Sequence, residues 1–197
     1  TWGANWSGEL GDGTTTHRST PVQVSGLSGV VAVAAGEYHT LAVKGDGTVW
    51  AWGRNQYYGA LGDGTTIDRS TPVQVGGLSG VLAVAAGFSH SLAVKDDGTV
   101  WAWGNGHWGQ LGDGTTPWER STPVQVSGLS GVASVAAGGF SSLAVKCDGT
   151  VWAWGDNSWG QLGDGTTTDR WTPVQVSGLT GVVAIAAGRS RRSSGPC

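Results

Sequence analysis

A unit of about 51 residues is repeated along the chain with few changes, and this repeat limits the possible folds more than any other feature of the sequence. The block Leu-Gly-Asp-Gly begins four times, at Leu10, Leu61, Leu111 and Leu162. The block Val-Trp-Ala-Trp-Gly begins three times, at Val49, Val100 and Val151. Because a unit of this size cannot bury its apolar face alone, the copies must stack against one another.

Each unit has the pattern of four short β-strands. In one copy the predicted strands are Val30–Ala35, Thr40–Lys44, Thr48–Trp52 and Pro72–Val75. An Asp-Gly pair, typical of a tight hairpin, separates the second strand from the third, and the proline suits an edge strand because no ladder donor is needed there. Since no window has a helical period, we expect roughly fifteen strands in the chain and almost no helix.

Four-stranded units of this length are typical of β-propeller blades. We therefore expect an all-β propeller with about four blades per chain, the last of them incomplete, and a solenoid is the structural alternative. The repeats occupy residues 1–188, divided into 1–36 (partial), 37–87, 88–138 and 139–188, and a non-repeat tail follows at 189–197. The equivalent residues Trp52, Trp103 and Trp154 are expected to pack as mostly buried rings.

The composition argues against several function classes. Only 13% of the residues are charged and the formal net charge is -3, so the chain lacks the basic surface that binds nucleic acid. Its apolar runs are shorter than the ~20 residues of a membrane-spanning helix, so we expect no membrane span. We also expect no cofactor. Cys147 and Cys197 have no His or Cys cluster around them to bind a metal ion. If the tail follows the path of a strand, Cys147 and Cys197 occupy equivalent sites on adjacent blades. Such sites should lie further apart than the ~7 Å between Cα atoms that a disulfide tolerates, so we expect no disulfide between them within one chain.

Two segments, Ser91–Gly104 and Trp154–Gly163, resemble the repeat of the regulator of chromosome condensation family. The resemblance extends from residue 1 to about residue 188 and implies a β-propeller. The best-known members of that family form seven-bladed propellers; one is an exchange factor for a small nuclear GTPase, and a bacterial relative inhibits β-lactamases. The chain looks most similar to secreted bacterial members with near-identical repeats, which implies a location outside the cell or on its surface.

The recurring polar residues favour structural roles, and we expect no active site. His39 and His90 share a repeat position, but no repeated carboxylate or nucleophile accompanies them. The Leu-Gly-Asp-Gly aspartates suit turns better than Ca²⁺, which needs six to eight oxygens. Four arginines before Thr-Pro are expected to fix a neighbouring loop or carbonyl: Arg18, Arg69, Arg120 and Arg170.

The loops before Leu-Gly-Asp-Gly are rich in aromatic residues: Trp6, Tyr57, Tyr58, Trp108 and Trp159. Equivalent loops of a propeller lie at equivalent places around the ring, so these side chains could form an aromatic belt for a sugar or a protein partner. Packing between blades is the alternative. Trp118 and Trp171 stand outside the pattern and are expected on the surface.

The two ends of the repeat region look like halves of one blade. Thr1-Trp2-Gly3 matches the end of a third strand, whereas Val182–Ala187 matches a first strand whose edge the polar tail cannot cover. The candidate inter-chain edge is Trp2, Val182, Val183 and Ile185. We expect chains to pair end to end, in a ring of about eight blades or a filament, unless the chain is a fragment of a longer propeller.

Together these features favour a non-enzymatic repeat scaffold, a binding or self-assembling module whose partner is a second copy or another protein. A lectin-like carbohydrate binder that uses the aromatic loops is the alternative. The resemblance implies exchange activity only where irregular loops and acidic residues break the repeat, and this chain has few of them, so an exchange factor or an enzyme inhibitor is less favoured.

Overall fold

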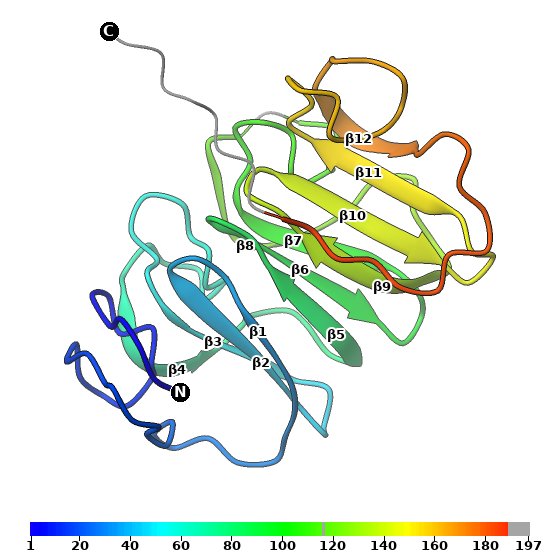
Figure 1. Ribbon diagram of the computed structural model, residues 1–197. Helices are drawn as coiled ribbons and strands as arrows, with labels where there is room; N and C mark the ends of the chain where they lie inside the picture. Colours follow the sequence, from blue (N-terminus) through cyan, green and yellow to red (C-terminus); the bar gives the residue numbers. More distant parts are fainter. Residues whose placement is uncertain (116, 189–197) are drawn as a thin grey trace, which may run out of the picture.

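The computed structural model describes residues 1–115 and 117–188, which form three four-stranded antiparallel sheets (Figure 1). The first sheet contains β1 (Val30–Ala35), β2 (His39–Lys44), β3 (Val49–Gly53) and β4 (Arg69–Gln74). The second contains β5 (Val81–Ala86), β6 (His90–Lys95), β7 (Val100–Asn105) and β8 (Glu119–Gln125). The third contains β9 (Val132–Ala137), β10 (Ser141–Lys146), β11 (Val151–Gly155) and β12 (Arg170–Gln175). Each sheet keeps its strands in chain order, as the blades of an all-β propeller do.

The described residues form twelve strands rather than the roughly fifteen expected, and no helix occurs among them. The difference lies at the two ends of the chain. Val182–Ala187, predicted as a strand, belongs to no sheet, because no described segment pairs with it. At the other end, Gly3 and Arg18 form only an isolated bridge.

The apolar core lies between the blades, which explains why the repeats need one another. The inner strand β5 packs against β1 and β2 of the first blade, and β9 packs against β5 and β6 of the second. Each sheet begins at its alanine-rich strand, so the blades are offset from the sequence units 37–87 and 88–138. The outermost strands contain Pro72, Pro123 and Pro173. An edge strand has a neighbouring strand on one side only, so it tolerates a residue without a backbone N–H.

The three equivalent tryptophans are buried at the blade interfaces, as predicted: Trp52 is 1% exposed, and Trp103 and Trp154 are 0% exposed. Each indole N–H also donates a hydrogen bond to a main-chain carbonyl of the preceding repeat. The acceptors are Glu9 for Trp52 (2.8 Å), Ala60 for Trp103 (2.8 Å) and Gln110 for Trp154 (2.9 Å). A buried indole needs such a partner, so each ring fixes the position of the preceding loop.

Glycine makes this close approach possible. Gly62 has a φ of 68°, and a Cβ atom added there would lie 2.8 Å from Nε1 of Trp103. The equivalent Gly11 and Gly112 meet Trp52 and Trp154 at the same 2.8 Å. The glycine that follows leucine in each of these blocks is therefore required by sterics as well as by turn conformation.

Two buried His–Ser pairs also link adjacent blades. Nε2 of His39 lies 2.9 Å from Oγ of Ser91, and Nε2 of His90 lies 3.0 Å from Oγ of Ser142. The Ser91 hydroxyl donates to the Ala60 carbonyl, so its oxygen accepts from His39 Nε2–H. Burial lowers the pKa of His39 to about 4 and that of His90 to about 3, and both rings are therefore neutral at neutral pH. These histidines are built into the blade interface.

Replacing Trp103 with alanine should lower the free energy of unfolding by about 3–5 kcal/mol, because the change leaves a large cavity and an unpaired carbonyl. Chemical denaturation measures this loss. Trp159→Ala is the control, since that ring is 71% exposed and should change stability by only about 0.5 kcal/mol. Equal effects of the two substitutions would contradict the packing role.

Lowering the pH from about 6.5 to 4.5 should destabilise the protein, because the unfolded chain protonates His39 and His90 while the folded chain does not. The expected slope is up to about 1.4 kcal/mol per pH unit for each histidine. Urea denaturation across this range measures it. The double variant His39→Gln/His90→Gln should flatten the slope, and an unchanged slope would refute the assignment.

Candidate functional site

Aromatic residues of several turns and loops lie at the same end of the blades. The pairing of His39 with Gly53 places the β1–β2 turn and the β3–β4 loop at the same end of the first blade, and the other blades repeat this arrangement. We call this end the aromatic face and define it by two groups of residues. The turns contribute Tyr38, Phe88 and Phe140, and the loops contribute Trp6, Tyr57, Tyr58, Trp108 and Trp159.

A polar network holds each long loop of this face. In the first blade, Asp63 accepts bonds from the main-chain N–H and hydroxyl of Thr65 and from the Arg69 guanidinium (2.8 Å). Asn55 donates to Asp63 (3.2 Å) and accepts from the amide of Leu61 (2.9 Å). These contacts support the turn interpretation of the aspartates and the loop-fixing interpretation of the arginines, rather than a Ca²⁺ site.

The same network recurs around Asp12 and Asp164. Arg18 lies 2.8 Å from Asp12, and Arg170 lies 2.6 Å from Asp164. The hydroxyl of Thr14, assisted by Arg18, lowers the pKa of Asp12 to about 2. These carboxylates are therefore ionised and occupied by the loop itself at neutral pH.

The loop of the second blade, between β7 and β8, is held differently. Gly106 replaces the asparagine of the other loops, and the ion pair between Arg120 and Asp113 is longer, at 3.2 Å. The ring of His107 lies 4.4 Å from that of Trp108 and stacks on that of Trp118, also at 4.4 Å. Ring contacts thus supplement the weaker polar network.

The five loop aromatics differ in exposure. Trp6, Tyr57 and Trp159 are 75%, 61% and 71% exposed, so these rings do not fill the space between blades. Trp108 and Tyr58 are half-buried. Trp6 packs edge-on against His17, with ring centroids 4.3 Å apart. The exposed rings thus stand on well-supported loops without contacting one another directly.

The turn aromatics form a row that the sequence analysis missed. The Tyr38 ring lies 5.4 Å from Phe88, and Phe88 lies 5.3 Å from Phe140. These rings follow the Ala-Ala-Gly block, but Phe88 comes one residue after its glycine, whereas Tyr38 and Phe140 come two residues after theirs. Aligning the repeats therefore does not put the three aromatic residues in one column. In the sequence they are recognisable only as one aromatic residue close to each turn.

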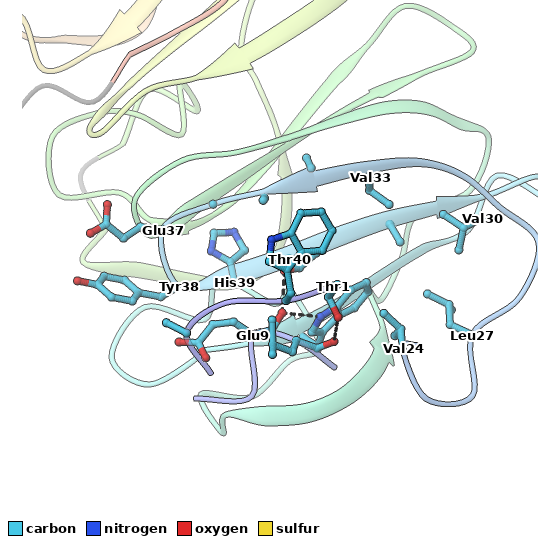
Figure 2. Close-up of a pocket in the computed structure, with 18 of the residues that line it drawn as sticks. Thr1, Glu9, Val24, Leu27, Val30, Val33, Glu37, Tyr38, His39 and Thr40 are labelled. Carbon is cyan, nitrogen blue, oxygen red and sulfur yellow. Dashed lines mark hydrogen bonds between the residues drawn. The ribbon is translucent and has the colours of Figure 1, made fainter. Parts of the chain in front are cut away.

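A groove of about 770 Å³ lies between residues 1–29 and the first blade (Figure 2). Val24 and Leu27 line it opposite Val30 and Val33 of β1, and Tyr38 lies at the end that meets the aromatic face. Val30 is 39% exposed, whereas its equivalents Val81 and Val132 are 3% and 4% exposed. The face that adjacent blades cover elsewhere is therefore open here.

Residues 1–29 supply the outer half of a blade beside this groove. The bridge between Gly3 and Arg18 corresponds to the pairing of Gly53 with Arg69, and the Val22 amide donates to the Thr1 carbonyl (2.8 Å). The expected match of Thr1-Trp2-Gly3 to the end of a third strand agrees with this pairing. Trp2 lies on the groove and is 67% exposed.

The segment Val182–Ala187 starts as an inner strand does. The Val182 amide donates to the Gly149 carbonyl at 3.1 Å, and Val81 and Val132 make the same bond to Gly47 and Gly98. In Figure 1 the segment, in red, runs along the third blade. Val183 is 93% exposed and Ile185 is half-buried, so this end also carries uncovered apolar side chains.

Within the described residues, no group of three or more His, Cys, Asp or Glu side chains could hold a metal ion. Cys147 is exposed, and Cys197 lies outside the described residues, so the expectation about their disulfide stays a prediction. No helix in the described part of the chain is long and apolar enough to cross a membrane.

The chain is 36% identical over 177 residues to the Homo sapiens E3 ubiquitin-protein ligase HERC2, covering 84% of this chain and 4% of HERC2. It is 37% identical over 174 residues to the Arabidopsis thaliana ultraviolet-B receptor UVR8, covering 85% of this chain and 39% of UVR8. The chain thus spans well under half the length of either relative. Both relatives are eukaryotic and lend no support to the expected secreted bacterial type.

Among solved structures, yeast RCC1 (Prp20) bound to Kap60 superposes with a TM-score of 0.74 at 24% identity, covering 89% of this chain and 43% of that chain. A likeness at this identity concerns the fold alone, and it favours a propeller over a solenoid. The RCC1-like domain family matches residues 1–192. The shared repeat, its three described blades and these relatives together show that the chain belongs to the RCC1-like domain family.

Proposed function

We propose that this chain is a non-catalytic binding module that recognises a protein partner with its aromatic face. The observation that carries the proposal is the exposure of Trp6, Tyr57 and Trp159 on loops that their own polar networks hold in place. Tyrosine and tryptophan dominate the binding energy of protein interfaces, and rings that are already positioned lose little conformational entropy on binding.

The row of Tyr38, Phe88 and Phe140 extends this surface toward the inner strands. An area that combines a half-buried aromatic row with exposed rings from several blades suits an extended protein surface better than a single sugar. The yeast relative Prp20 is found bound to Kap60, and its binding to Gsp1p and histones is described, which supports a protein partner by analogy.

A non-catalytic role is supported by the state of the polar residues. His39 and His90 are neutral, buried and bonded to serines, and the loop aspartates are paired with arginines. General acid–base catalysis needs a titrating group within reach of a substrate, and these groups face the blade interface or their own loop.

We also propose that the groove of the first blade takes up an inner strand from a second copy of the chain. In the two complete interfaces of the described chain, the equivalent wall is covered by β1–β2 or β5–β6. The sequence Val-Val-Ala-Ile-Ala-Ala at 182–187 differs from that of β1 at a single position, and Val183 is 93% exposed. The candidate edge of Trp2, Val182, Val183 and Ile185 therefore has the composition that such a contact needs.

The triple variant Trp6→Ala/Tyr57→Ala/Trp159→Ala should bind partner peptides at least about tenfold more weakly, because it removes the exposed anchors. The peptides are those that the wild-type chain selects from a random display library. Leu82→Ala is the control, since Leu82 is 63% exposed on β5 away from this face.

Unchanged peptide binding by the triple variant would contradict the protein-binding proposal. A parallel glycan array tests the lectin-like alternative: glycans bound by the wild type and lost in the triple variant would replace the protein partner with a carbohydrate.

Val33→Lys should convert associated chains to monomers in light scattering, because it places a charge on the wall of the groove. Val33 is 69% exposed, so the change should not cost folding stability. The matched control Leu82→Lys, also on an inner strand but outside the groove, should stay associated. A wild-type chain that is monomeric up to about 100 μM would refute self-association.

A further inference from the structure

The loop of the first blade, between β3 and β4, departs from the repeat. It carries an extra residue at Tyr57-Tyr58 and an arginine, Arg54, where the other copies have Ala4, Asn105 and Asp156. Tyr57 is the one non-glycine residue with a positive φ, 78°, in the described part of the chain. A tyrosine is held in this conformation only when its surroundings enforce it, so the loop displays Tyr57 in a defined place.

The Arg54 guanidinium lies over two aromatic rings. The guanidinium carbon is 5.1 Å from the centroid of Tyr38 and 5.8 Å from that of Tyr57. The Arg54 amide also donates to the Tyr38 carbonyl at 2.7 Å. Next to it, Asp68 accepts bonds from the amides of Asn55 (2.7 Å) and Gln56 (2.8 Å), which fixes the backbone of the loop.

The fold itself does not use the charge of Arg54. Arg18, Arg69, Arg120 and Arg170 each pair with an aspartate of their own loop. Arg54 takes part in none of the ion pairs among the described residues, and the other copies have uncharged or acidic residues at this position. A guanidinium held over aromatic rings without a carboxylate partner has N–H groups left to donate to an anion, and its planar fork matches a carboxylate.

We infer that Arg54, braced by Tyr38 and Tyr57, is the anchor for an acidic side chain of the protein partner, and this inference rests on the proposed protein-binding function. Tyr38 begins the aromatic row that continues through Phe88 to Phe140. A carboxylate placed on Arg54 would position the neighbouring apolar residues of the partner over this row. The partner motif is therefore a Glu or Asp next to large apolar side chains.

The test is a nuclear magnetic resonance titration with two blocked peptides, Glu-Phe-Leu-Leu and Gln-Phe-Leu-Leu, which differ only in the carboxylate. The Glu peptide should shift the Nε–H signal of Arg54 and the amide signal of Phe88, and it should bind roughly fivefold more tightly than the Gln peptide. Arg54→Asn, which installs the residue of the second blade, should remove this preference without changing the melting temperature.

Arg54→Lys keeps the charge but not the planar fork, so it should retain only part of the preference. Equal binding of the two peptides, an unchanged preference in Arg54→Asn, or no shift of the Arg54 signal up to about 10 mM peptide would overturn the inference. The protein-binding proposal has its own test: it fails if the triple variant of Trp6, Tyr57 and Trp159 still binds the peptides selected by the wild-type chain. The failure of one proposal can therefore be distinguished from the failure of the other.

Discussion

The contact on which the rest of the structure depends is the hydrogen bond from a buried tryptophan to a loop carbonyl of the preceding repeat. Trp103 fills the space between the first two blades and donates to the carbonyl of Ala60. The bond demands a close approach that only glycine permits at position 62. Apolar burial is non-directional, so by itself it would not fix the relative position of adjacent blades. The hydrogen bond from the same ring is directional and does fix it.

This contact places a demand on the long loops, since an irregular segment has to hold its carbonyl in place without a strand ladder. An Asn–Asp–Arg network meets the demand in three of the four loops: in the first blade, for example, Asp63 is bonded to Thr65, Arg69 and Asn55. In the β7–β8 loop, which has Gly106 in place of the asparagine, the Asp113–Arg120 pair and the ring contacts of His107 take this role. The chain has few charges, and a good part of them is used in these pairs. Loops made rigid for a structural reason then also present exposed rings with little entropy left to lose on binding.

The sequence predicted the features that follow from short-range pattern and repetition. Four strands per blade, the edge prolines and the buried Trp52 could be anticipated because turn chemistry, alternation and equivalence determine them. The aromatic row and the contact of Arg54 with Tyr38 could not, since they join residues of different turns and loops whose spacing varies by one between copies. The missing strand at Val182–Ala187 shows another limit, because a strand needs a hydrogen-bonding neighbour as well as a favourable sequence.

Because the copies are nearly identical, comparing equivalent positions distinguishes residues that every blade needs for folding from residues that only one blade carries. The aspartate of Leu-Gly-Asp-Gly is the same in all four copies, and each one makes the same ion pair, so its role is structural. Position 54 and its equivalents instead hold Arg, Ala, Asn and Asp, and their exposure differs: Ala4 is exposed and Arg54 is half-buried, whereas Asn105 and Asp156 are buried. Asn105 and Asp156 accept bonds from the amides of His107 (2.9 Å) and Ser158 (3.2 Å) in their own loops, whereas the Arg54 guanidinium lies over the rings of Tyr38 and Tyr57. A face whose blades carry Arg54 over tyrosine rings, a His–Trp stack and the exposed Trp159 is asymmetric. Under the proposed binding function, that asymmetry would favour one orientation of the docked partner.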